Sequence, residues 1–305
     1  MALDPDVLFD RRRLKRQLIV WRVLGAVALV ALALSLVWRF NQAGLPLGDY
    51  VAELDISGII VDDRDRLDAL KAVGEDERAR ALVVIIDSPG GTYIGGETLY
   101  LALRKVAEKK PVVAVMRGVA ASGGYMTALG ADRIFARDGT ITGSIGVIMQ
   151  TADVTGLLDK LGIRPESFKS SALKATPNPL ETVTPEVRLA TQAVVNNMYG
   201  AFLEMFIDRR GIEPATAGRL ADGRIFTGRQ ALAAGMIDEI GGIEEARAWL
   251  ESAREVAASL PVSDITPDED DSIVEKMISA AIGDNGGPAA LRLDGLLSVW
   301  HPLHR

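Results

Sequence analysis

The chain has 305 residues, of which 48% are hydrophobic and 25% are charged, so it can form one large domain or two small ones with a substantial core. Its formal net charge of −7 argues against nucleic acid as the main partner, because phosphate binding needs a basic surface. The absence of cysteine excludes disulfides, thiol catalysis and cysteine metal sites, and no acidic spacing matches a known metal loop, so we expect no metal and no cofactor.

The first 40 residues predict a membrane anchor. A basic cluster within residues 1–16 precedes an apolar stretch, residues 17–40, that is long enough to cross a bilayer as a helix. Trp21 and Trp38 bracket this stretch as interfacial anchors do. Because basic flanks stay in the cytoplasm, we expect residues 1–16 inside and the rest of the chain outside. A cleaved signal peptide is the competing interpretation.

After a short linker, residues 41–50, strands and helices alternate through residues 51–263. The pattern predicts strands at 51–56, 81–86, 111–116 and 133–136. It predicts helices at 62–79, 97–109, 184–208, 214–220 and 228–234. This alternation indicates an α/β fold of βαβ units with a largely parallel sheet. Residues 264–305 are interpreted as an acidic linker and a C-terminal tail, with an apolar helix candidate at 273–282.

Two glycines follow the second predicted strand, in the run Asp87-Ser88-Pro89-Gly90-Gly91. Glycines at this place let the backbone approach a ligand and turn its N–H groups toward it. Such donors stabilise the oxyanion that forms during acyl transfer. We therefore assign Gly90 and Gly91, together with Gly123, to an oxyanion hole. An ordinary tight turn is the alternative.

Ser122 is the candidate nucleophile, because the small residues of Ala121-Ser122-Gly123-Gly124-Tyr125 leave its hydroxyl accessible. A serine needs a neighbouring base, and the histidines, His301 and His304, both lie in the last five residues. A lysine is the best remaining choice, because a desolvated ammonium loses its proton readily. This points to a Ser-Lys dyad.

Two lysines compete for the role of base. Lys174 lies between apolar neighbours (Ala172, Leu173 and Ala175) that are able to exclude water. Lys169 is interpreted as a solvated surface charge.

Five motifs occur in an order that resembles the signal peptide peptidases of the bacterial SppA-type Ser-Lys protease family, over about residues 51–250. They are Asp87–Gly91, Ala121–Tyr125, Thr142–Val147, Phe168–Ser170 followed by Lys174, and Asp222–Ala231. The resemblance implies a crotonase/Clp-protease-like spiral of βαβ units. It also implies a serine endopeptidase of the bacterial inner (cytoplasmic) membrane, with its catalytic domain on the periplasmic side, that degrades remnant signal peptides after their release from preproteins.

The resemblance also assigns residues to roles. Ser122 matches the nucleophile, Lys174 the general base, Ser144 a serine that orients the base, and Gly91 the oxyanion loop. One departure is Ser171, which stands where the family often has a glycine after Lys-Ser. The likeness to short, single-copy members implies a homo-oligomer in which Ser122 and Lys174 of adjacent subunits meet. The expected partners are apolar peptides, membrane lipid and further copies of the chain, and not nucleic acid.

Three alternatives stay open. A crotonase-type acyl-CoA hydratase or isomerase also uses backbone N–H groups after a strand, but it would need an acidic catalytic residue and a CoA-binding surface. A membrane-anchored scaffold would keep the fold without the chemistry, which the presence of Ser122, Ser144 and Lys174 disfavours. A Clp-type Ser-His-Asp protease would require the tail to deliver His301 or His304.

Overall fold

A computed structural model describes residues 21, 22, 25, 48–267 and 297–299 of the chain. It divides into two units, residues 1–47 and 48–305, and the fold described below is that of the second. Most of the expected anchor at 17–40 lies outside the described residues, as do the helix candidate at 273–282, His301 and His304. In the part that is described, no helix is both long and apolar enough to cross a membrane.

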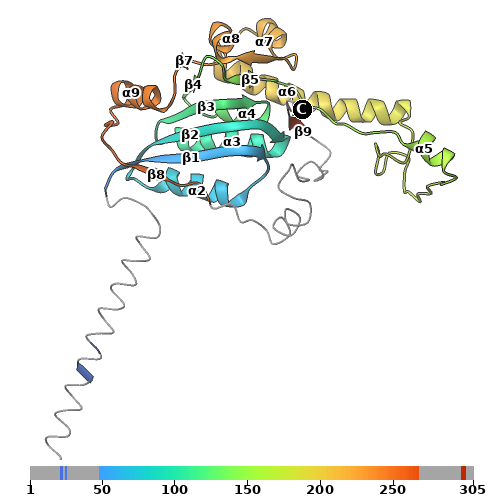
Figure 1. Ribbon diagram of the computed structural model, residues 1–305, viewed down its shortest axis with the longest axis horizontal. Helices are drawn as coiled ribbons and strands as arrows, with labels where there is room; N and C mark the ends of the chain where they lie inside the picture. Colours follow the sequence, from blue (N-terminus) through green and yellow to red (C-terminus); the bar gives the residue numbers. More distant parts are fainter. Residues whose placement is uncertain (1–20, 23–24, 26–47, 268–296, 300–305) are drawn as a thin grey trace, which may run out of the picture. The chain divides into compact units, whose positions relative to one another are not determined.

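Strands and helices alternate along the described chain (Figure 1). The strands are β1 (Tyr50–Ile60), β2 (Ala79–Thr92), β3 (Val112–Ala121), β4 (Arg133–Ala136), β5 (Ile141–Gly143), β6 (Ile225–Thr227), β7 (Glu239–Ile240), β8 (Val262–Asp264) and β9 (Leu297–Val299). The helices are α2 (Arg64–Glu75), α3 (Tyr93–Ala107), α4 (Gly123–Ala128), α5 (Thr155–Lys160), α6 (Pro185–Arg210), α7 (Pro214–Leu220), α8 (Gly228–Ala233) and α9 (Ile243–Arg254).

The strands form one mixed sheet, in which the main order is β6-β5-β3-β2-β1-β8. β4 pairs with β3 and β7 beside this path, and β9 pairs with β2. The pairs of β1 with β2, β2 with β3 and β3 with β5 are parallel, whereas β5–β6 and β2–β9 are antiparallel. The expected α/β fold is thus confirmed, with two antiparallel pairings that the sequence pattern did not predict.

Both faces of the central sheet are covered, as the continuous apolar runs of its strands require. Along β2, Leu82, Val84 and Ile86 pack into a core with residues of α2, α3, α4 and α6. The alternate residues Val83 and Ile85 pack on the opposite face, against Ala246 and Leu250 of α9 and other residues. Because parallel strands buried on both faces end at one edge, the turns after β2, β3 and β5 gather there.

Helix α6 begins where its sequence signals predict and ends at Arg210, two residues beyond the predicted end at 208. The Thr184 side chain accepts a hydrogen bond from Val187 N at 3.2 Å, and Pro185 occupies the first turn. The helix ends at Gly211, whose φ of 61° is the left-handed conformation that glycine adopts readily. The cap expected at Thr184 is confirmed.

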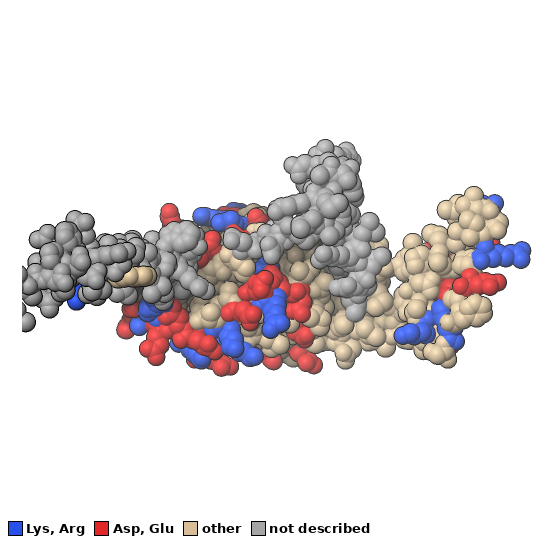
Figure 2. All heavy atoms as spheres, turned by 90° about the horizontal axis from the view of Figure 1, so that it is seen from below, with Lys and Arg blue, Asp and Glu red and all other residues tan. Residues whose placement is uncertain are grey.

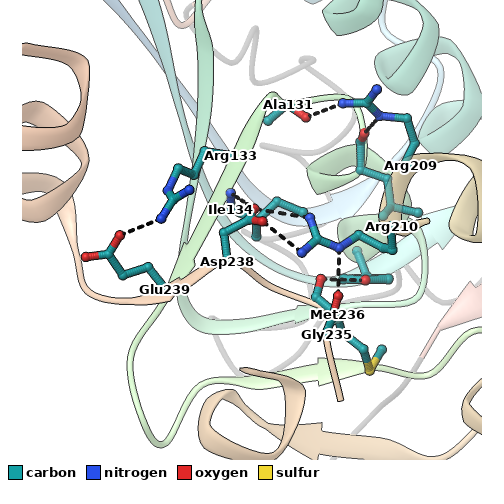
Figure 3. A network of polar contacts seen from close by, with 11 residues as sticks. Ala131, Arg133, Ile134, Arg209, Arg210, Gly235, Met236, Asp238 and Glu239 are labelled. Carbon is teal, nitrogen blue, oxygen red and sulfur yellow. Dashed lines mark hydrogen bonds and ion pairs between the residues drawn. The ribbon is translucent and has the colours of Figure 1, made fainter. Parts of the chain in front are cut away.

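The C-terminal end of α6 is fixed to α4 and the strands beside it (Figure 3). Arg209 donates to Leu129 O and Ala131 O at 2.9 and 2.8 Å. Arg210 forms an ion pair with Asp238 at 2.9 Å and donates to Gly235 O. These contacts hold α6 against the short helix that follows Ser122.

Inside the same region, Tyr125 of α4 is completely buried. Its hydroxyl donates to Met236 O at 2.7 Å, and its ring meets the edge of Phe206 of α6 at a centroid distance of 6.0 Å. Burial raises the pKa of Tyr125 far above its usual range, so its hydroxyl stays a neutral donor. The position of α4, and with it the turn at Ser122, is therefore set by packing on several sides.

Candidate active site

Ser122 lies in a strained turn between β3 and α4. Its φ is 53° and its ψ is −116°, a conformation that costs a non-glycine residue of order 1–3 kcal/mol. The Ser122 N–H donates to Gly143 O at 2.8 Å, which ties the turn to the end of β5. Only 1% of the residue is exposed. A serine held in a sharp strand-to-helix turn is the arrangement of a nucleophile elbow.

Ser144 occupies the equivalent place after the neighbouring strand. β3 and β5 pair in parallel with Ala121 opposite Gly143, so Ser122 and Ser144 leave the sheet at the same level. Ser144 also has a positive φ, 52°, and its N–H donates to Arg224 O at 2.8 Å. The structure thus brings the expected nucleophile and the expected orienting serine to one edge of the sheet.

The glycine loop, residues 88–91 at the C-terminal end of β2, is shaped by the buried side chain of Ser88. Ser88 Oγ donates to Gly58 O at 2.6 Å and accepts a hydrogen bond from Gly90 N at 3.1 Å. Gly90 adopts a φ of 113°, which other residues rarely take. The Gly90 N–H is therefore already engaged with Ser88, and Gly90 contributes its conformation to this segment.

Gly91 and Gly123 bring the loop and the serine turn into contact. A Cβ on Gly91 would lie 1.8 Å from Ile60 O, so any side chain there collides with β1. A Cβ on Gly123 would lie 3.2 Å from Gly91 N, so the Gly91 nitrogen lies close to the first residue of α4. Gly123 begins that helix, where N–H groups have no intrahelical acceptor. Gly91 and Gly123 are therefore the better placed of the three candidate donors.

The expected base belongs to a segment separate from the strands and turns that carry the two serines. Lys174 is exposed, and it lies in the segment between α5 and α6. Figure 1 shows α5 at the end of α6 that is remote from α4. The apolar neighbours of Lys174 do not bury it, because Leu173 is itself 41% exposed. The expectation that they exclude water from Lys174 is wrong for the single chain.

Lys169 also differs from its expected surroundings. Its side chain is 15% exposed and forms an ion pair with Glu181, whose carboxylate also accepts from Ser167 Oγ at 2.6 Å. The Lys169 hydrogen bond lowers the pKa of Glu181, so this carboxylate stays charged. The interpretation of Lys169 as a solvated charge was wrong, because it pairs with a residue 12 positions further along the chain.

The segment that carries Lys174 exposes many large apolar side chains. Between residues 148 and 194 they are Ile148, Leu157, Leu161, Ile163, Phe168, Leu173, Leu180, Leu189 and Val194, with Phe168 98% exposed. We call residues 148–194 the arm. Figure 2 shows the outer part of the arm, at the right of the view, with uncharged residues between several Lys, Arg, Asp and Glu side chains. An apolar surface of this extent is typical of a binding interface.

These features define the class of the protein. A buried serine in a strained turn, beside a glycine amide and a second serine, is the arrangement of a hydrolase that transfers an acyl group to serine. Among the described residues no group of histidine, cysteine or carboxylate side chains is arranged to hold a metal. The turn at Ser122 at the edge of an α/β sheet is the feature that favours a serine hydrolase.

The comparisons with known proteins give the family. Residues 104–257 match peptidase family S49. A Synechocystis protein provisionally named as a protease, slr0021, is 38% identical over 216 residues, which are 70% of this chain and 76% of that protein. An Enterococcus faecium protein with the provisional name signal peptide peptidase SppA is 32% identical over 210 residues. The aligned region covers 64% of this chain and 61% of that protein. The chain belongs to peptidase family S49 and is an SppA-type peptidase.

A solved structure matches more distantly. A mutant of a membrane-bound stomatin-specific protease, 1510-N, aligns with 73% of this chain at 19% identity, and the match covers 100% of that structure with a TM-score of 0.43. Membership of the peptidase family favours a serine protease over the hydratase alternative.

The motifs predicted Ser122, Ser144, Gly91 and Gly123, because each lies at or just beyond the C-terminal end of a strand. Sequence reasoning missed Ser88 as the residue that shapes the glycine loop, although its place between a buried strand and two glycines was a usable signal. It also missed strand β9, because three residues of a tail carry no periodic pattern.

Proposed function

We propose that the protein is a membrane-anchored serine endopeptidase that uses Ser122 and Lys174 to degrade remnant signal peptides. The observation that carries the proposal is the turn at Ser122, buried and strained, with the Gly91 nitrogen close to Gly123, the residue that follows it. In the reaction, Ser122 Oγ attacks the peptide carbonyl carbon while the neutral amine of Lys174 takes the hydroxyl proton. The amide groups of Gly91 and Gly123 donate to the resulting oxyanion.

The intermediate then collapses to an acyl-enzyme. The scissile C–N bond breaks, and the lysine ammonium gives its proton to the leaving amine. Water attacks the ester with the same lysine as base, which regenerates the serine. Ser144, next to Ser122 at the end of β5, is suited to orient the lysine by a hydrogen bond.

We propose that the lysine comes from a neighbouring copy of the chain. Three observations support this. Lys174 is exposed, and α5 of the arm lies at the end of α6 that is remote from α4. The arm also exposes large apolar side chains that a second copy of the chain could bury. From Phe206, which packs on α4, to Pro185 the helix rises about 30 Å, at 1.5 Å per residue. A second copy that covers the arm would bury its apolar surface and bring Lys174 to a serine in one step.

The sequence and the name of one relative support the substrate class and the location that we propose. The apolar stretch at 17–40 suits an anchor in the bacterial inner membrane, with the peptidase domain on the periplasmic side. Apolar peptides left in or near the membrane would then be the accessible substrates, in keeping with the name of the Enterococcus relative. The βαβ order of β1, β2 and β3 is compatible with the expected crotonase/Clp-like spiral.

Cleavage of a signal-sequence peptide by the detergent-solubilised full chain tests the proposal. Ser122→Ala and Lys174→Ala should each remove nearly all turnover, and the double variant should be little worse, because the two residues act as a unit. Ser170→Ala, an exposed serine in the arm, is the matched control and should keep its activity. Wild-type turnover in Lys174→Ala would contradict the dyad. Turnover by Ser122→Ala would contradict the nucleophile.

A further inference from the structure

The segment that carries Lys174 has no helix or strand of its own. α5 ends at Lys160 and α6 begins at Pro185, and residues 161–184 between them consist of turns and irregular chain. Irregular segments of this length are uncommon in compact domains, and they are usually functional where they are ordered. Because no ladder of backbone hydrogen bonds runs through residues 161–184, side-chain contacts are needed to fix the position of Lys174.

One carboxylate joins the two sides of this segment. Glu181 accepts a hydrogen bond from Ser167 Oγ at 2.6 Å through one oxygen, and it pairs with Lys169 Nζ at 2.5 Å through the other. These contacts join residues that are 14 and 12 positions apart. We call residues 167–181 the lysine loop. Lys174 lies near its middle in sequence, and Glu181 closes the loop at its base.

Short-range hydrogen bonds order the middle of the lysine loop. The Lys174 N–H donates to Ser171 O at 3.1 Å. The Thr176 hydroxyl donates to Leu173 O at 2.9 Å. Each of these bonds spans three residues, so they shape the chain locally and do not set where it lies relative to the rest of the arm. The contacts of Glu181 cross the whole loop and do set this.

The base of the lysine loop differs from an ordinary surface ion pair, which contributes little. The side chain of Lys169 is 15% exposed and that of Glu181 is 34% exposed. The hydrogen bond from Lys169, followed by that from Ser167, lowers the pKa of Glu181, so the carboxylate is charged at every pH at which a lysine could act as a base. Without this carboxylate, the largely buried ammonium of Lys169 would lack its counter-charge.

We propose that Glu181 is the positioning residue of the general base, and that its contacts with Lys169 and Ser167 hold the lysine loop in the shape that presents Lys174 to Ser122. The inference rests on the proposed function for the role of Lys174. Because Lys174 is exposed in its own chain, the backbone of the loop sets the direction of its side chain. A displacement of about 1 Å at a reacting group costs about 100-fold in rate.

The test compares Glu181→Gln with Glu166→Gln in the detergent-solubilised full chain, on an apolar signal-sequence peptide. Glu166 is an exposed carboxylate one residue before the lysine loop, so both changes remove one charge from the same segment. Glu181→Gln should lower kcat about tenfold or more with KM unchanged, because the loss affects the reaction and not the binding of peptide. Glu166→Gln should match the wild type. An unchanged kcat in Glu181→Gln would overturn the inference.

Reversal of the ion pair supplies a rescue. Lys169→Glu and Glu181→Lys place like charges together and should each lower kcat about tenfold or more. The double variant restores opposite charges at the base of the loop, so it should recover most of the loss. A double variant no more active than either single variant would contradict the pairing as the cause.

A double-mutant cycle with Lys174 separates positioning from a general loss of structure. On a peptide p-nitrophenyl ester, whose good leaving group keeps residual turnover measurable, Glu181→Gln should change nothing once Lys174→Ala is present, because Glu181 acts through Lys174. An equal loss with and without Lys174 would overturn the inference. So would a fall in kcat that accompanies a smaller assembly by light scattering, because Glu181 would then act on assembly.

The outcomes also separate this inference from the proposed function. If Lys174→Ala abolishes peptide cleavage while Glu181→Gln keeps its kcat, only the inference fails. If Lys174→Ala cleaves at the wild-type rate, the proposed function fails and the inference with it. Amide hydrogen exchange at residues 170–180 reports on the loop without any activity. Exchange should be faster in Glu181→Gln than in Glu166→Gln, and equal rates would overturn the inference.

Discussion

Ser122 and Ser144 leave adjacent parallel strands at the same level, and each adopts a positive φ, 53° and 52° respectively. The Ser122 N–H donates to the carbonyl of Gly143, the residue before Ser144, at 2.8 Å. Two non-glycine residues in this conformation, side by side, place two hydroxyl-bearing side chains at one edge of the sheet. Strain of this kind persists where the surrounding structure holds it, and it is frequent at active sites.

Replacing Ser144 should therefore affect the reaction more than the fold. We expect Ser144→Ala to lower kcat about 10- to 100-fold, less than the full contribution of a positioned base. Ser144→Gly relieves the positive φ and also removes the hydroxyl, so it should lose about as much activity. Steady-state kinetics on both variants check this. Recovery of activity in Ser144→Gly alone would show that the backbone, and not the hydroxyl, is what matters.

Ser88 should be needed for the shape of the oxyanion loop. Ser88→Ala leaves Gly58 O and Gly90 N without their buried partner, at a cost of about 1–3 kcal/mol in the free energy of unfolding. A freed Gly90 amide also loosens the loop that carries Gly91, so kcat should fall while KM changes less. Urea unfolding and kinetics measure the two effects. An unchanged kcat would show that Ser88 serves stability alone.

Gly91 should tolerate no side chain. In Gly91→Ala the new Cβ would lie 1.8 Å from Ile60 O, a backbone atom that cannot move without disturbing β1. We expect a loss of more than about 3 kcal/mol in the free energy of unfolding, or failure to fold. Gly139→Ala is the matched control, because no atom lies within 4 Å of its added Cβ. Similar melting temperatures for the two variants would contradict the close approach.

The sequence predicted those parts of the site that depend on local pattern. Buried strands at 81–86 and 111–116 place Gly91 and Ser122 at one sheet edge, because parallel strands end together. The partner of Lys169 was beyond reach, since Glu181 is brought to it by the fold of the arm. The exposure of Lys174 was also not predictable, because apolar neighbours in sequence do not ensure burial in space.

Acid should weaken the link between β1 and the end of α2. Hydrogen bonds from Arg78 lower the pKa of Asp76 to about 2, and Asp76 also accepts from the Tyr50 hydroxyl at 3.1 Å. A depressed carboxyl pKa stabilises the fold above the unfolded value of about 3.9, and this contribution is lost as the pH falls toward 2. Asp76→Asn should therefore be less stable than wild type at pH 6, with the difference shrinking by pH 3.

Urea unfolding at several pH values measures this difference. Asp68→Asn is the control, because the Asp68 side chain is 68% exposed in its pair with Arg64 and should contribute little. A gap between Asp76→Asn and wild type that stays constant from pH 6 to pH 3 would contradict the assigned cause.

The arrangement of the arm makes the two halves of the dyad separable. Ser122 belongs to the turn after β3, whereas Lys174 lies exposed on the arm, in the segment between α5 and α6. Ser122→Ala chains and Lys174→Ala chains carry complementary lesions. If mixed before assembly, they should form some interfaces where an intact serine faces an intact lysine. Activity should return in part, and it should be greatest near equal amounts.

The control is a pair of lesions in the same half of the dyad. Ser122→Ala mixed with Ser122→Gly offers no intact serine, so it should stay inactive at every ratio. Pull-down with two different tags shows whether the mixed chains share oligomers. Co-assembled Ser122→Ala and Lys174→Ala chains that remain inactive at all ratios would mean that the site is built within one chain, and that the arm must bend to deliver Lys174. Restored activity requires a second copy, because neither lesion can be repaired within its own chain.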